Sequence, residues 1–284
     1  MFTIGTIPAP GMPTPAAPKQ PALFLAHGDP ALTMDDADAT NRWLRRLGPL
    51  LRANPPTAVL CISAHHVAPR LRLTGAEHPA TLHDHPHPAL QPFTYPAPGS
   101  PLLTRRVLEL LLHAGLEATV DHERGLDHGA WVPLSRMFPE HDLPVVQLSL
   151  HAQNDPELHL EIGRAIEPLR GEGVLLVGSG GVTHDAGLAA SPDDRGPLPE
   201  WARRFDAWVI EIVTRAAPYA RSRGLAQYRE HEHALKAQPT DDHFMPLLVV
   251  AGAASVDKSR DNVGELVHTA AQRGQSMSAF RFGR

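Results

Sequence analysis

The 284-residue sequence contains a single cysteine, Cys61. One thiol excludes an intramolecular disulfide and any zinc module built from several thiolates. A metal bound by this chain must therefore be held by histidine and carboxylate side chains. A lone cysteine is also typical of proteins that work in a reducing compartment, so we expect a cytoplasmic location.

Positive charge and long apolar runs are scarce as well. Lys and Arg together number 26 against 31 Asp and Glu, and the basic residues are scattered along the chain. Nucleic-acid binding needs a basic surface that neutralises phosphates, so we expect no nucleic-acid partner. No apolar run approaches the roughly 20 residues that span a bilayer, so we expect no membrane segment.

The first 20 residues lack the basic start and apolar core of a secretory signal, and they carry prolines at positions 8, 10, 13, 15 and 18. We interpret residues 1–20 as a loose, proline-rich tail. No later segment has the composition of a linker. The remaining residues, 21–284, are then expected to form one domain, which is long enough to bury a sizeable core.

Histidine, in contrast, is abundant, with 18 copies. His27, His65 and His184 each follow a short apolar run, and such runs, bounded by turn formers, are typical of strands buried on both faces. Strand patterns alternate with helix patterns, which predicts an α/β fold whose central, mostly parallel mixed sheet has helices on both faces. Strands are expected at residues 22–26, 58–66, 118–120, 143–150 and 174–177, with an edge strand at 276–282. Helices are expected from a cap at Asp35 or Asp36 to residue 53, and at 101–114, 131–138, 156–170, 201–216, 225–236 and 243–254.

Strand-end histidines would converge if their strands are neighbours, because parallel strands end at the same edge of a sheet. His243, at the start of an expected helix, could join His27, His65 and His184 there. Neutral imidazoles suit Fe(II), Zn(II), Cu(II) or Ni(II), and the spacing does not separate these metals. The alternative is that these histidines cap turns or fill the core.

The glycine-rich segment 178–181 allows three interpretations. Its backbone N–H groups could cradle a phosphate, although the segment lacks the lysine of a P-loop. Ser179 could be the nucleophile of a hydrolase triad, although Val177 stands where a nucleophile elbow has its first glycine. The third interpretation, which we favour, is that the glycines let the backbone approach a ligand closely.

Several short motifs, taken together and in order, resemble the class III extradiol ring-cleaving dioxygenases, and in particular the DOPA-type 4,5-dioxygenase branch. The resemblance extends from about Pro21 to Phe282. The motifs are His27-Gly28-x-Pro30, Ser63-Ala64-His65, Tyr95-Pro96-Ala97-Pro98-Gly99, Gly125-Leu126-Asp127-His128-Gly129, Pro144-Val145-Val146-Gln147-Leu148-Ser149, Gly178-Ser179-Gly180 with His184, and His243-Phe244-x-Pro246-Leu247.

This resemblance implies a catalytic domain over residues 21–284 that cleaves a catechol with O₂. It implies one metal ion, Fe(II) in active members with Zn(II) able to occupy the same site. The roles that it implies are His27, His65 and His243 as metal ligands, His184 as an acid/base group near enough to be a fourth ligand, His128 as a second histidine facing substrate, and Tyr95 with Pro96 as part of the substrate wall. A histidine that titrates near neutrality suits the proton transfers of such a reaction.

The chain departs from the family pattern around the site. Asp29, His66 and Asp185 replace the serine, tryptophan and asparagine that are common there, Gly181 replaces another asparagine, and the segment 84–88 is histidine- and proline-rich. Asp29 and Asp185 could orient imidazoles or could simply stabilise turns. Two other functions stay open: a zinc-dependent hydrolase or lyase on the same scaffold, and a non-catalytic metal- or ligand-binding protein.

Overall fold

The computed structural model describes residues 19–185, 196–256 and 263–283. The expected tail, residues 1–20, lies outside this part of the chain except for its last two residues. Within the described ranges, none of the helices combines the length and the apolar character that a membrane crossing requires.

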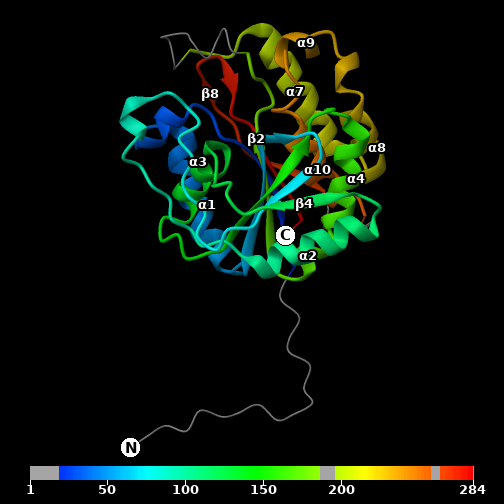
Figure 1. Ribbon diagram of the computed structural model, residues 1–284. Coiled ribbons are helices and arrows are strands. Elements are labelled where there is room, and N and C mark those ends of the chain that lie inside the picture. The colour runs from blue at the N-terminus through cyan, green and yellow to red at the C-terminus, as the bar shows by residue number, and fades with distance from the viewer. Residues whose placement is uncertain (1–18, 186–195, 257–262, 284) are drawn as a thin grey trace, which may run out of the picture.

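One eight-stranded mixed sheet, in the order β4-β3-β5-β2-β6-β1-β10-β7, runs through the molecule (Figure 1). Its central strands β5, β2, β6 and β1 are parallel. At one side β10 pairs antiparallel with β1 and β7 pairs antiparallel with β10, and at the other side β3 pairs antiparallel with β5. The strands are β1 (Ala22–Ala26), β2 (Ala58–Ala68), β3 (Leu71–Thr74), β4 (Ala118–Asp121), β5 (Val145–His151), β6 (Val174–Gly180), β7 (Gly264–His268) and β10 (Ala279–Phe282). A small separate hairpin consists of β8 (Ala271–Gln272) and β9 (Gln275–Ser276). The predicted α/β class and mostly parallel sheet are confirmed.

Helices cover both faces of the sheet, as the alternating pattern predicted (Figure 1). The α-helices are α1 (Ala39–Arg52), α2 (Pro101–His113), α3 (His128–Met137), α4 (Pro156–Ile166), α5 (Pro168–Gly171), α7 (Glu200–Arg215), α8 (Pro218–Ala226), α9 (Ala234–Ala237) and α10 (Met245–Ala253), with short 3₁₀ turns at Pro30–Met34, Pro88–Leu90 and Tyr228–Glu230. Side chains of α1 and α3 pack on one face, and those of α2, α4, α7, α8 and α10 pack on the other.

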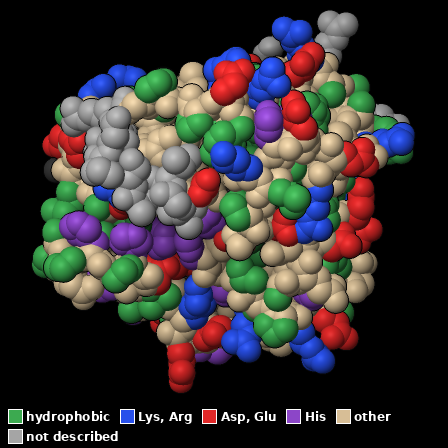
Figure 2. Space-filling model, turned by 90° about the horizontal axis from the view of Figure 1, so that it is seen from above, with side chains coloured by type: hydrophobic (Ala, Val, Ile, Leu, Met, Phe, Trp, Pro, Cys, Tyr) green, Lys and Arg blue, Asp and Glu red, His purple; other side chains and the backbone are tan. Residues whose placement is uncertain are grey.

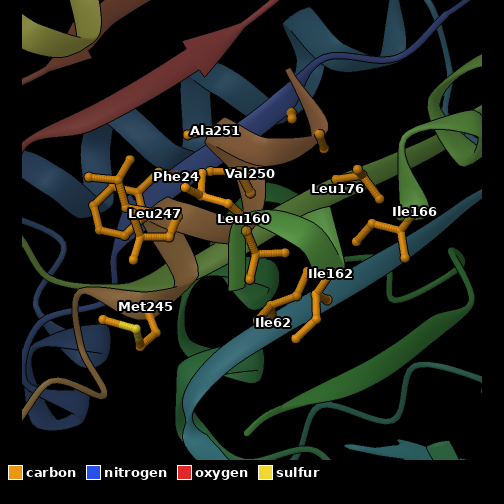
Figure 3. Close-up of a cluster of buried hydrophobic side chains, with 14 of the residues drawn as sticks. Phe24, Ile62, Leu160, Ile162, Ile166, Leu176, Met245, Leu247, Val250 and Ala251 are labelled. Atoms are coloured by element: carbon orange, nitrogen blue, oxygen red, sulfur yellow. The ribbon is translucent and has the colours of Figure 1, made fainter. Parts of the chain in front are cut away.

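The larger core lies beneath α10, whose residues are all buried. Figure 3 shows Leu247 and Val250 of this helix beside Phe24 of β1 and Leu160 of α4. Alternate residues of the same strand, such as Leu23, point into the opposite cluster under α1 and α3. A strand with both faces covered by apolar groups reads as a continuous apolar run, which is why β1, β2 and β6 were recognisable in the sequence.

Several predicted boundaries are wrong. The first helix is capped by Asp38, whose carboxylate accepts the Asn41 N–H, because Asp35 instead closes a preceding turn through the Ala37 N–H. The predicted helix 156–170 is interrupted before Pro168, which starts the short helix α5. The predicted helix 225–236 is not continuous: this range covers the end of α8, the 3₁₀ turn Tyr228–Glu230 and the start of α9.

The carboxyl-terminal prediction is also corrected. Residues 276–282 do not form an edge strand: β10 begins at Ala279 and lies between β1 and β7. The edge on that side is β7, which the pattern did not reveal because Glu265 and its neighbours are exposed and lack a clear apolar period. The last apolar helix begins at Met245, so His243 lies just before it.

Candidate metal centre and substrate pocket

Strand register brings the first two predicted site histidines together. In the parallel pairs, Ala26 of β1 lies opposite Gly180 of β6, and Ser63 of β2 lies opposite Ser179. His27 and His65 follow these positions at nearly the same level of the sheet. Their Nε2 atoms are 3.1 Å apart. His65 lies inside β2, which continues to Ala68, so it is not a strand-end residue as predicted.

Three more predicted histidines complete a cluster at this edge of the sheet. His128 is the first residue of α3, His184 follows β6, and His243 precedes α10. Ring centroids are 3.7 Å apart for His65 and His128, 5.0 Å for His65 and His243, and 3.4 Å for His184 and His243. Figure 2, which looks down on the top of the molecule, shows histidine side chains gathered in a band on that face. The structure therefore brings together all five predicted histidines.

The donor set fits a divalent metal ion. Ligand atoms of His27, His65 and His128 all lie within 4.8 Å of one another. Two nitrogens that each lie about 2.1 Å from one ion are roughly 3.0–3.4 Å apart, close to the His27–His65 separation. Burial, followed by the neighbouring imidazoles, lowers the pKa of His27 well below its usual value and lowers the pKa of His65 to about 2. These rings are thus neutral at pH 7, which is the form that binds metal.

Ser179 fixes the orientation of His27. The Ser179 hydroxyl donates to the Gly129 carbonyl oxygen at 2.5 Å, and its oxygen lies 3.0 Å from His27 Nδ1. Because the single hydroxyl hydrogen is used on Gly129, Nδ1 of His27 must be the donor in the second contact. The tautomer that results leaves a lone pair on Nε2, which faces His65. Ser179 is fully buried in β6, so the hydrolase-nucleophile interpretation is wrong.

Carboxylates orient two further histidines. His128 Nδ1 donates to Asp84 Oδ2 at 2.9 Å, and His243 Nδ1 donates to Asp242 Oδ2 at 2.6 Å. Burial favours a higher pKa for Asp242, but the hydrogen bond from His243 overcomes it and holds this pKa well below its usual value. Such carboxylate–histidine pairs are common around metal sites. Neither carboxylate was predicted from the sequence, although Asp242 could have been found from its position next to His243.

Asp127 ties the segment before α3 to the sheet. Its buried carboxylate accepts from Ser63 Oγ at 2.6 Å, from Gln147 Nε2 at 2.9 Å and from Arg124 Nη2 at 3.0 Å. The same Arg124 nitrogen donates to the His65 carbonyl oxygen at 3.1 Å. Asp127 also caps α3, whose first residue is His128. The Asp127 network therefore holds His128 beside the strand that carries His65.

Glycines allow two close backbone contacts around the cluster. A Cβ on Gly129 would lie 2.2 Å from Ser63 Oγ, and one on Gly180 would lie 2.2 Å from the His243 carbonyl oxygen. That oxygen also accepts the Gly181 N–H at 2.9 Å. Gly180, the last residue of β6, therefore allows the close approach of the segment that carries His243. Gly180 and Gly181 also line the cavity described below, so close approach of a ligand to this backbone stays a prediction.

His184 stacks on His243 with only 4° between the ring planes. Burial, followed by His243, lowers the pKa of His184 to about 4. At pH 7 this ring is a neutral imidazole that is able to accept a proton. It also lines the cavity described next.

The cluster forms the floor of a cavity of about 250 Å³. This is near the lower end of the sizes of ligand pockets, about 300–1,000 Å³, and suits a single-ring compound. The walls include Asp84, Thr183 and the β8–β9 hairpin. Neither Tyr95 nor Pro96 is among the described residues that line it. Tyr95 is buried in the core cluster under α1 and α3, where its hydroxyl donates to the Phe138 carbonyl oxygen at 3.3 Å.

Three residues that depart from the family pattern, Asp29, His66 and Asp185, each lie within two residues of a histidine of the cluster. His66 is buried, so it fills interior volume, and burial lowers its pKa to about 3. Asp29 accepts from the Ala31 N–H at 2.8 Å and pairs with Arg273. Asp185 contacts Gln275 through its backbone. Asp29 is thus a turn residue whose carboxylate also pairs with a cation.

Residues 21–281 match the family described as the catalytic LigB subunit of aromatic ring-opening dioxygenase. The chain is 39% identical to a 4,5-DOPA dioxygenase extradiol of Escherichia coli over 239 residues, covering 83% of this chain and 85% of that protein. It is 36% identical to a protein of the same name from Beta vulgaris, over 92% of this chain and 95% of that one. The crystal structure of an uncharacterized Escherichia coli K12 protein matches with a TM-score of 0.78 and 34% identity, over 93% of this chain and all of that chain.

Proposed function

The chain belongs to the LigB family of class III extradiol dioxygenases, and from this premise we propose that it cleaves the ring of a catechol-type substrate with O₂ and Fe(II). The observation that carries the proposal is the buried convergence of imidazoles at the floor of a single-ring-sized cavity. The location that we propose is the cytoplasm, in keeping with the single cysteine.

We assign His27, His65 and His243 as the metal ligands. His27 and His243 each have Nδ1 committed to a neighbouring acceptor, which leaves Nε2 as the ligand atom. Fe(II) held by these residues would supply the electron chemistry by which O₂ opens the catechol ring. Three imidazoles also suit Zn(II), so the metal is tested directly below.

His184 is the acid/base group in this proposal. Its lowered pKa, about 4, keeps it neutral at pH 7, so it accepts the proton of a catechol hydroxyl in the cavity. It stacks on His243 and its backbone N–H donates to the Ala237 carbonyl oxygen at 2.7 Å, so the ring is held in place at the cavity wall. The same imidazole returns the proton as the ring opens to a semialdehyde acid.

His128 is the second histidine that faces the substrate. Its Nδ1 is bound to Asp84, so Nε2 is the atom available to a substrate oxygen. The ring is nearly buried, which keeps bulk water from this side of the cavity. His128 thus positions the substrate opposite His184.

The decisive experiment is anaerobic reconstitution of metal-free protein with Fe(II), Zn(II) or Mn(II), followed by a panel of catechols and oxygen. O₂ uptake and a yellow ring-cleavage product should appear together with Fe(II). His184→Ala should keep iron and lose turnover. Absence of oxygen consumption with every catechol, while iron binds stoichiometrically, would refute ring cleavage. Turnover of esters or amides with Zn(II) alone would select the hydrolase reading instead.

A further inference from the structure

The β8–β9 hairpin bridges the two loops that carry His27 and His184. On one side, Gln272 Oε1 accepts the Asp29 N–H at 3.0 Å. On the other side, Gln275 Nε2 donates to the Asp185 carbonyl oxygen at 2.7 Å, and Gln275 Oε1 accepts the Asp185 N–H at 3.2 Å. The hairpin is therefore fixed across the carboxyl ends of β1 and β6. Residues 272, 273 and 275–277 all line the histidine-floored cavity.

The turn of this hairpin holds an unusual residue. Arg273 and Gly274 form the two-residue connection, and both have positive φ, 48° and 70°. Such turns favour Asn or Gly, because an L side chain is strained in this conformation. The backbone conformation therefore disfavours an arginine at the first position, so the reason for Arg273 must lie in its side chain.

The Arg273 guanidinium places a positive charge in the wall of the cavity. Arg273 is the sole Lys or Arg among the described residues that line the cavity, and Nη1 pairs with Asp29 Oδ2. The two side chains are 28% and 15% exposed, so the pair is shielded but reachable from the cavity. The Ala31 N–H holds the other Asp29 oxygen. Asp29 therefore positions the guanidinium in the cavity wall.

We propose that Arg273 binds a carboxylate on the substrate, so that the enzyme prefers catechols that bear a short carboxylate arm over neutral catechols. This inference rests on the proposed function for the catechol half of the substrate. A guanidinium carries five N–H donors in a rigid fork, which allows it to bind a substrate carboxylate while it stays paired with Asp29. A phosphate dianion fits less well, because Asp29 and Asp84 both line the cavity and would repel it.

The kinetic test compares two substrates that differ only in charge, 3-(3,4-dihydroxyphenyl)propionate and its methyl ester, with the iron-loaded enzyme. Arg273→Met should lower kcat/KM for the acid by about 10- to 100-fold, mainly through KM, and leave the ester within about 2-fold. Arg273→Lys should restore part of the preference. Arg215→Met is the matched control, because Arg215 is 79% exposed on α7 and is not among the cavity residues. Equal losses for acid and ester in Arg273→Met would overturn the proposal.

A binding test separates this inference from the proposed function. 3-Phenylpropionate and 3-phenylpropanamide lack the catechol hydroxyls, so calorimetry reports their affinity without turnover. Wild type should bind the acid more tightly than the amide, and Arg273→Met should abolish the difference. Tight acid binding that survives in Arg273→Met would mean that the carboxylate binds elsewhere, and would overturn the inference. Arg273-dependent acid binding in an enzyme that cleaves no catechol would support the carboxylate site and refute ring cleavage.

Discussion

His128 and Asp84 are joined twice: the Asp84 carboxylate accepts the His128 ring Nδ1–H at 2.9 Å and the His128 backbone N–H at 3.1 Å. Burial favours a higher pKa for Asp84, but these hydrogen bonds overcome it and hold the pKa below its usual value. Asp84 is therefore ionised at neutral pH. It connects the long loop before α2 to the first residue of α3, and so fixes which nitrogen of His128 faces the cavity.

Asp84→Asn tests this orientation. The amide can still accept the backbone N–H, but it is a weaker acceptor for the ring and can present its N–H₂ group instead. We expect kcat to fall about 10- to 100-fold, with iron content unchanged because His128 is not among the assigned ligands. Asp142→Asn, at an exposed pair with Arg52, is the matched control. Full activity in Asp84→Asn would show that the His128 orientation does not matter for turnover.

The contacts of His27 give a second prediction, on metal affinity. Ser179→Ala removes the acceptor of the His27 Nδ1–H and leaves that donor buried. The ring then loses its fixed tautomer, and iron affinity should fall about 10- to 100-fold. A competition titration with a chromophoric chelator measures this directly. Ser135→Ala, which removes a hydroxyl that donates to the Val132 carbonyl oxygen of its own helix, should leave the affinity unchanged. Equal affinities in all three proteins would contradict the role of Ser179.

The fold and part of the site were predictable from local patterns. Strands β1, β2 and β6 are apolar on both faces, so they stand out in the sequence, and parallel register then brings His27 near His65. Asp84 carries no such signal, because it lies in an irregular loop and its partner His128 is 44 residues further along the chain, beyond α2 and β4. The pair of Asp29 and Arg273 spans 244 residues and depends on a hairpin whose strands have two residues each, too short for any periodicity.

The assignment of ligands makes a third prediction. His27, His65 and His128 have ligand atoms that all lie within 4.8 Å of one another, whereas the family resemblance implies His243 in place of His128. We expect His27→Ala, His65→Ala and His243→Ala each to lose bound iron, and His128→Ala and His184→Ala to retain it. Elemental analysis of the purified variants gives the stoichiometry, and circular dichroism confirms that each is folded. Loss of iron in His128→Ala with retention in His243→Ala would reverse the assignment.

His159 makes the fourth prediction, on stability against pH. This fully buried imidazole donates from Nδ1 to the Asp155 carbonyl oxygen at 2.7 Å and accepts the His151 N–H on Nε2 at 3.2 Å. If Nε2 were protonated, it could no longer accept the His151 N–H, and two N–H donors would face each other. Burial lowers the pKa of His159 below its usual 6.5 in the folded protein. The folded state therefore keeps His159 neutral at a pH where the unfolded chain already binds a proton.

The sign follows from that difference. Above about pH 6.5, His159 is unprotonated in both the folded and the unfolded state, so the free energy of unfolding does not depend on this group. Below about pH 6.5, the unfolded state binds a proton at His159 and the folded state does not, so the free energy of unfolding falls as the pH decreases. His159→Gln keeps a donor and an acceptor but cannot titrate. We expect it to be less stable than wild type at pH 7.5, and the gap to narrow toward pH 5 by up to about 1.4 kcal/mol per pH unit. Urea unfolding from pH 5 to 8 measures both curves, with the exposed His113→Gln as control. Parallel curves for wild type and His159→Gln would mean that His159 titrates equally in both states.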